Sequence, residues 1–225
     1  MMLALAACAN RLPPPPSSQP SPSTPPLPQA QPSPGAQPST VADLAQAIDA
    51  LAKRSDHEPD SKIREQLAIE AGHDAQDCLA QQPQAAACLY GHAVALGLMA
   101  RTHPTRAGEF LTSMLDALAK AETVDPAYQD AGPARVRALV LIRAPGWPLG
   151  PGDPEAGLAA ARRAVALSAL YPPNLLALAE ALAKSGDAAA AKLNYSRARD
   201  AALALPAGSD RDDWVRQAGQ GLQHQ

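Results

Sequence analysis

Residues 174–206 read NLLALAEALAKSGDAAAAKLNYSRARDAALALP, and this stretch decides the fold. Apolar residues in its first half recur at the spacing of one helix face, at Leu175, Leu178, Ala179 and Leu182. Gly186 then ends one helix and Asp187 caps the next, because glycine tolerates a left-handed turn and a carboxylate accepts free amide hydrogens. The second helix carries small and aromatic residues at its packing positions, Ala191, Tyr195 and Ala198. The stretch therefore predicts a helical hairpin.

The same turn occurs earlier in the chain at a fixed period. Gly152-Asp153 and Gly186-Asp187 lie 34 residues apart, which is the length of a tetratricopeptide repeat. Pro154 suits the first position of the following helix, where its missing N–H costs nothing. The order of large and small residues over 175–182 also resembles that repeat. We therefore predict hairpins of the tetratricopeptide type.

Three looser hairpins precede this one. The predicted helices pair as 41–54 with 62–80, 85–101 with 105–122, and 134–143 with 155–170. A last helix over 209–223 begins with the capping-box-like Ser209-x-x-Asp212 and has the polar face of a terminal cap. The predicted fold is all-α, a tetratricopeptide-like solenoid of about four helical hairpins plus a C-terminal capping helix. An irregular helical bundle is the alternative.

Composition argues against several classes of function. The net charge is −3 and the basic residues are scattered, so no basic stripe could follow a nucleic-acid backbone. No apolar run approaches the roughly 20 residues that span a bilayer. Alanine dominates and aromatic residues make up only 3% of the chain, a composition typical of closely packed helices.

The first residues resemble a bacterial lipoprotein signal peptide. Leu5-Ala6-Ala7-Cys8 is similar to the lipobox cleaved by the type II signal peptidase, which would leave Cys8 lipidated. The stretch before Cys8 is short and carries no Lys or Arg, so a chance cysteine is the alternative. The resemblance predicts a periplasm-facing protein anchored to a membrane by lipid, and Ala9 favours the outer membrane.

The composition also predicts the domain organisation. Residues 9–40 are rich in Pro, Ser and Gln and have almost nothing apolar to bury, so we predict a disordered linker or tether. Residues 1–8 form the signal remnant and lipidation site, and residues 41–225 form the helical domain.

Cys78 and Cys88 remain as an even pair once Cys8 is assigned to lipid. Ala71, Ala75 and Cys78 hold the packing positions of one predicted helix, and Cys88 lies early in the next. In an oxidising compartment we expect a disulfide that staples this hairpin. Two buried free thiols are the alternative.

A Pro/Gly loop over residues 144–152 departs from the repeat. It is longer than a repeat turn requires, which indicates a separate purpose. Trp147 lies between its prolines and is predicted either to cap the apolar interior of the superhelix or to line a pocket.

Several short motifs together resemble the T-component family of TRAP transporters. They are Asp125-Pro126-Ala127-Tyr128, Gly132-Pro133, Ala144-Pro145-Gly146-Trp147-Pro148, Gly152-Asp153, and Cys88-Leu89-Tyr90 before Ala93-x-Ala95-Leu96-Gly97. The resemblance implies a tetratricopeptide-like periplasmic lipoprotein with an internal channel or pocket, which docks to the solute-binding component of the transporter. It also allows a homo-oligomer.

No catalytic motif accompanies this fold. The sequence lacks an H-E-x-x-H arrangement, a G-x-S-x-G elbow and a phosphate-cradling glycine loop, so we predict no enzyme activity, metal or cofactor. The first helices of the hairpins line the concave wall of such solenoids. The residues predicted to contact a ligand or partner there are Tyr90, His92, Arg101 and Arg137. Cations on an apolar wall would suit a carboxylate-bearing ligand, although solvated surface charge is the alternative.

These features predict a non-catalytic scaffold that binds a solute-binding protein and a small ligand. A generic tetratricopeptide lipoprotein for envelope or pilus assembly is the alternative, and it predicts an open groove for an extended peptide.

Overall fold

The computed structural model describes residues 39–224, and these form α-helices without any strand. The helices are α1 (Val41–His57), α2 (Ser61–Gln81), α3 (Ala86–Thr102), η1 (Pro104–Arg106), α4 (Ala107–Val124), α5 (Tyr128–Arg143), α6 (Pro154–Leu167), α7 (Pro172–Lys184), α8 (Ala188–Leu203) and α9 (Ser209–Gln223). The predicted site Cys8 and almost all of the predicted tether lie outside the described residues.

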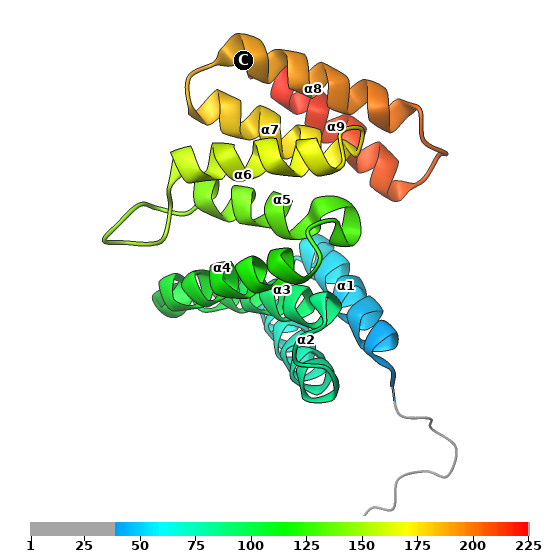
Figure 1. Ribbon diagram of the computed structural model, residues 1–225, viewed down its shortest axis with the longest axis vertical. Coiled ribbons are helices and arrows are strands. Elements are labelled where there is room, and N and C mark those ends of the chain that lie inside the picture. Colours follow the sequence, from blue (N-terminus) through cyan, green and yellow to red (C-terminus); the bar gives the residue numbers. More distant parts are fainter. Residues whose placement is uncertain (1–38, 225) are drawn as a thin grey trace, which may run out of the picture. The chain divides into compact units, whose positions relative to one another are not determined.

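Consecutive helices pair into four hairpins, α1–α2, α3–α4, α5–α6 and α7–α8, and α9 packs on the last of them (Figure 1). The first helices of successive hairpins also contact one another in series, α1 with α3, α3 with α5, and α5 with α7. They form the inner layer of a solenoid, and the second helices form the outer layer. The prediction of a tetratricopeptide-like solenoid with a capping helix is confirmed.

Capping side chains explain where the second helices of the last two hairpins, α6 and α8, begin. Asp153 and Asp187 each accept a hydrogen bond from the backbone N–H three residues later, at 3.0 Å, and Gly186 adopts a φ of +87°. The predicted capping box at Ser209 is wrong, because Gly208 occupies the N-cap and no side chain caps α9. A reciprocal capping box occurs instead at α1, between Thr40 and Asp43.

Small side chains let the helices approach closely. The predicted packing positions of α2, namely Ala71, Ala75 and Cys78, are all fully buried. In α7 the predicted face is buried as well, and it packs against α5, α6 and α8. Gly157 shows how tight these contacts are, because an added Cβ would lie 2.8 Å from Ile142 Cγ1. The core is therefore a series of alanine-rich layers between neighbouring hairpins.

Cys78 and Cys88 form the predicted disulfide. It joins the last turn of α2 to the first turn of α3, and both cysteines are fully buried. None of the helices between residues 39 and 224 is both long and apolar enough to cross a membrane.

The start of α5 is not a regular helix. Gln129, Asp130 and Ala131 have φ values of +47°, +55° and +61°, a left-handed conformation that non-glycine residues rarely adopt. Such a conformation persists only where surrounding contacts hold it. The contacts come from Arg135 and Asn174, which donate hydrogen bonds to the carbonyl oxygens of this segment.

The Pro/Gly loop projects away from the helices between α5 and α6 (Figure 1). Its own backbone closes it, because Gly152 N donates to Pro145 O at 2.9 Å and Leu149 N donates to Gly146 O at 3.0 Å. Trp147 is 90% exposed and Leu149 is 79% exposed. The exposure of Trp147 does not fit the predicted role as a cap of the apolar interior, and its ring lines none of the three hollows described below.

Candidate functional site

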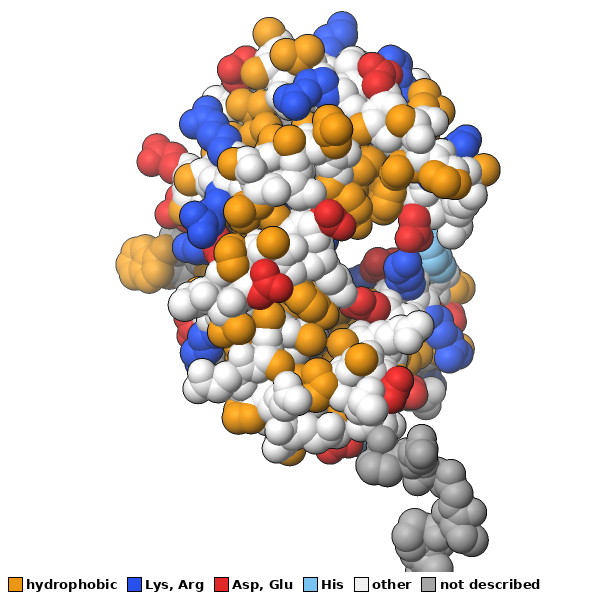
Figure 2. Space-filling view, turned by 45° about the vertical axis from the view of Figure 1, so that its right-hand side comes forward, with side chains coloured by type: hydrophobic (Ala, Val, Ile, Leu, Met, Phe, Trp, Pro, Cys, Tyr) orange, Lys and Arg blue, Asp and Glu red, His pale blue; other side chains and the backbone are white. Residues whose placement is uncertain are grey.

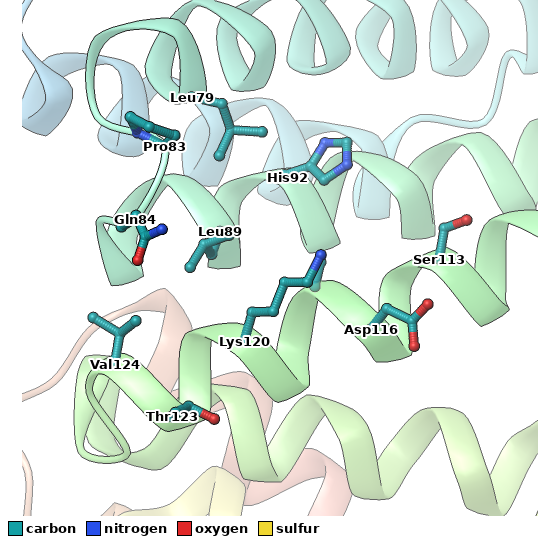
Figure 3. A pocket seen from close by; sticks show the side chains of 11 residues that line it. Leu79, Pro83, Gln84, Leu89, His92, Ser113, Asp116, Lys120, Thr123 and Val124 are labelled. Carbon is teal, nitrogen blue, oxygen red and sulfur yellow. The ribbon is translucent and has the colours of Figure 1, made fainter.

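A groove of about 780 Å³ lies between α2 and α4 (Figure 3). These two helices do not contact each other, so α3 is left uncovered beneath them. The lining comes from α2, the α2–α3 turn, α3 and α4, and it comprises Leu79, Pro83, Gln84, Leu89, His92, Ser113, Asp116, Ala117, Lys120, Thr123 and Val124.

The groove combines apolar side chains with polar and charged ones. Leu79 and Leu89 lie at one end, and Lys120 and His92 project into the middle (Figure 3). Burial lowers the pKa of His92 below its usual 6.5, and the Lys120 ammonium lowers it further. His92 is therefore biased toward the neutral imidazole, which can both donate and accept a hydrogen bond.

A second hollow of about 250 Å³ continues the groove toward the start of α4. His92 lines both hollows, and Ile69, Met99 and Phe110 make the second one mostly apolar. We call the combined feature the α2–α4 groove. Its length along two helices and its mixture of apolar and hydrogen-bonding side chains suit a segment of another protein.

A separate pocket of about 390 Å³ lies between α5, α7, α8 and α9. We call it the α5–α9 pocket. Its apolar side chains include Leu139, Leu176 and Trp214. Arg135 lines one part, and Arg143 is held by two hydrogen bonds to Glu180 at 2.7 and 2.6 Å. The pocket thus combines apolar walls with one guanidinium that is neutralised and one that is not.

Arg135 and Asn174 form a buried polar junction beside this pocket. Arg135 Nη1 donates to Asn174 Oδ1 at 3.0 Å and to the Asp130 carbonyl at 3.0 Å. Asn174 Nδ2 donates to the carbonyls of Asp130, Ala164 and Ser168 at 3.0–3.1 Å. One amide therefore ties α7 to both α5 and α6.

The first and last helices of the domain also meet. Lys53 Nζ of α1 lies 2.8 Å from Asp210 Oδ2 of α9, and Gln129 donates to Asp49 Oδ2 at 2.6 Å. Burial raises the pKa of Asp49, and the Gln129 hydrogen bond and nearby cations partly oppose this rise. Figure 2 shows acidic and basic side chains around a hollow on this face of the domain. The concave wall is thus polar where its two ends approach.

The structure does not bring the predicted contact residues together. Tyr90 is buried against Tyr128, with ring centroids 5.5 Å apart, and its hydroxyl lies near Arg135. His92 lies in the α2–α4 groove, on the other side of α3 from that junction. The remaining three lie elsewhere: Arg101 pairs with Asp56 at 2.5 Å, Arg137 lies 3.7 Å from Glu122, and Trp147 is exposed.

Sequence reasoning missed Arg135 and Asn174. Asn174 precedes Leu178 and Leu182 by one and two helical steps of four residues, so the periodicity places it on the buried face. Arg135 likewise precedes the buried Ala138 and Ile142 by three and seven residues, which places it on the same helix face. A polar residue at a position that the pattern marks as core was the available signal.

Comparisons with known proteins bear on the fold. No protein-family model matches the chain, and no curated protein matches it in sequence. Among solved structures, it is similar to a thermophilic tetratricopeptide-repeat (TPR) protein of Thermus thermophilus, with a TM-score of 0.55 and 20% identity. The match covers 81% of this chain and 92% of that chain. At this identity the likeness supports the tetratricopeptide-like fold and does not reach the narrower family suggested by the sequence motifs.

Proposed function

We propose that this protein is a non-catalytic scaffold that binds another protein through the α2–α4 groove. The groove itself carries the proposal, because it extends along two helices and offers both apolar side chains and hydrogen-bonding groups. Tetratricopeptide-like folds commonly present such surfaces, and this fold-level analogy supports a scaffold in general terms.

For the partner we propose the periplasmic solute-binding component of a TRAP-type transporter. The motifs shared with the T-component family support this choice, as does the lipobox-like sequence before Cys8. In this proposal Cys8 carries the lipid, residues 9–40 tether the helical domain, and the domain faces the periplasm from the outer membrane. The α5–α9 pocket would supply the small-ligand site that accompanies the partner.

The groove also favours one alternative. A tetratricopeptide lipoprotein for envelope or pilus assembly would hold an extended peptide in an open groove, and the α2–α4 groove has the form that such a role requires. The two proposals differ in the partner, so identification of the captured protein decides between them.

The test is capture of partners from native membranes by the full chain with a C-terminal tag. Val124 lines the groove and is 50% exposed, so Val124→Glu places a charge there with little effect on folding. Leu203 of α8 is 52% exposed and does not line the groove, so Leu203→Glu is the matched control. We expect Val124→Glu to reduce capture by about tenfold and Leu203→Glu to leave it unchanged.

Mass spectrometry of the captured protein supports the TRAP proposal if a solute-binding component is enriched by the unmodified chain and lost in Val124→Glu. Equal capture by both variants would remove the groove from the proposal. Mass spectrometry of the mature amino terminus tests the anchor, and Cys8→Ser should move the protein from the membrane to the soluble fraction.

A further inference from the structure

Arg135 is a buried cation without an acidic partner. It is 9% exposed, and it forms no ion pair with any carboxylate in residues 39–224. Burying a charge is costly unless hydrogen bonds and an opposite charge compensate it. The other arginine of the pocket, Arg143, has such compensation from Glu180.

The hydrogen bonds of Arg135 leave part of the guanidinium uncommitted. Nη1 donates three hydrogen bonds, to Asn174 Oδ1 and to the carbonyls of Gln129 and Asp130, and the Tyr90 side chain is a further hydrogen-bond partner of Arg135. The guanidinium lies over the Tyr171 ring at 5.1 Å, and it approaches the Tyr90 hydroxyl. Nε and Nη2 donate to no carboxylate or carbonyl in the described part of the chain, and a guanidinium can bind a carboxylate through two such donors.

The space next to Arg135 suits a small ligand. The α5–α9 pocket holds about 390 Å³, within the range of sites that enclose small molecules. Leu139, Leu176 and Trp214 make apolar walls in the pocket that Arg135 also lines. A ligand that fits both parts carries a negative head group and a hydrocarbon body.

We propose that the α5–α9 pocket binds a small amphiphilic carboxylate, with its head group on Arg135 and its hydrocarbon part against Leu139, Leu176 and Trp214. This inference rests on the ligand-binding part of the proposed function and names its chemical class. It does not depend on the protein partner, whose test reads the α2–α4 groove. Failure of one can therefore be told from failure of the other.

The acidic side chains around Arg135 and the pocket are engaged by other residues of the chain. Asp49 lies close enough for the Arg135 charge to act on its carboxylate, and Asp49 Oδ2 accepts a hydrogen bond from Gln129 at 2.6 Å. Lys53 lies near the same acid and pairs with Asp210. Glu180 lines the same pocket, and its carboxylate is paired with Arg143. None of Asp49, Asp210 and Glu180 forms an ion pair with Arg135, so a ligand carboxylate would displace no protein carboxylate from its guanidinium.

The test uses the fluorescence of Trp214 in the full chain. The sequence contains two tryptophans, so Trp147→Phe leaves Trp214 as the sole reporter, and Trp147 is exposed enough for this change to be neutral. Trp214 contacts the Tyr171 ring at 5.6 Å, on which Arg135 stacks. Octanoate is the probe, and octanamide is its uncharged counterpart. We expect saturable binding of octanoate and about tenfold weaker binding of octanamide.

Arg135→Met removes the charge while keeping most of the side-chain length, and it should weaken octanoate binding by about tenfold or more. Arg137→Met is the matched control, because Arg137 lies two residues away and faces Glu122; octanoate binding should stay unchanged. If Arg135→Met does not fold, the comparison of octanoate with octanamide still decides, since it needs no change at Arg135. Equal binding of the two probes, no saturable signal, or an equal loss in Arg137→Met would overturn the proposal.

Discussion

At the scale of single residues, Asn174 has the most demanding environment in the domain. It is fully buried, and its amide group joins α7 to the carbonyls of two neighbouring helices and to Arg135. A buried acceptor that loses its donor keeps the full cost of its desolvation. The left-handed turn at the start of α5 depends on the same bonds, because Asp130 O accepts from both side chains.

We therefore expect Asn174→Ala to lower the free energy of unfolding by about 2–4 kcal/mol. The comparison is Asn194→Ala, since Asn194 is also buried but bonds only within α8, to Ala190 O and Arg197. That change should cost about 1 kcal/mol. Urea denaturation followed by circular dichroism measures both, and equal losses would contradict a special role for Asn174.

His92 makes stability depend on pH. Its pKa is lowered in the folded chain by burial and then by Lys120, so the unfolded chain takes up the proton at a higher pH. Folding therefore becomes less favourable as the pH falls through the usual value of 6.5, and the loss levels off below the lowered pKa. We expect His92→Gln to reduce the difference in unfolding free energy between about pH 7.5 and about pH 5.

Lys120→Met provides a second variant for that measurement. It removes one cause of the lowered pKa and should reduce the acid-induced loss partially, and His57→Gln serves as the control for an exposed imidazole. An acid-induced loss that persists at full size in His92→Gln would assign it to other groups.

At the scale of elements, each hairpin is held by small side chains, and a disulfide joins the first hairpin to the second. The disulfide joins residues separated by 10 positions, so it closes a short loop between α2 and α3. Closing a loop reduces the entropy of the unfolded chain, and the effect grows only slowly with loop length. The link also lies beside the α2–α4 groove, whose lining includes the turn between these helices.

The double variant Cys78→Ala/Cys88→Ala should unfold at lower denaturant concentration, with a loss of about 2–3 kcal/mol. Addition of reductant should lower the stability of the unmodified chain in the same direction, and should leave the double variant unaffected. Cys8→Ala is the matched control, because it removes a cysteine that does not belong to the disulfide between α2 and α3. A reductant-insensitive unmodified chain would contradict the disulfide.

At the scale of the whole domain, α1 and α9 approach each other, although they are the first and last described helices. Lys53 and Asp210 make the shortest ion pair between them, and His57 lies 4.0 Å from Asp213. The Lys53 and Asp210 side chains are 67% and 51% exposed, so their pairing contributes little to stability. The pair bridges the two ends of the concave wall, and we predict that its charges influence how far apart these ends lie.

Lys53→Glu should lengthen the distance between spin labels on exposed sites of α1 and α9, because it opposes Asp210 with a like charge. The unfolding free energy should fall by less than about 1 kcal/mol. The swapped pair Lys53→Glu/Asp210→Lys should restore the distance, and high salt should weaken the effect. An unchanged distance in the single variant would show that packing alone holds the ends together.

Much of this architecture was determined by the sequence itself. The 34-residue period, the Asp caps and the alanine faces predicted the four hairpins and the capping helix, and the even pair of cysteines left beside Cys8 predicted the pairing of Cys78 with Cys88. These features are local, because helix periodicity, capping and short loop closure depend on residues close together in the chain. The polar start of α9 was misread because Gly208 and Ser209 offer competing positions for the cap.

The tertiary structure alone decided which side chains meet across hairpins. Arg135 and Arg137 are two residues apart on one helix, yet one lies in the buried junction and the other beside Glu122. The approach of α1 to α9, the open groove between α2 and α4, and the outward direction of Trp147 are equally absent from local pattern. The physical reason is that small rotations between successive hairpins accumulate along a solenoid, and no single repeat encodes their sum.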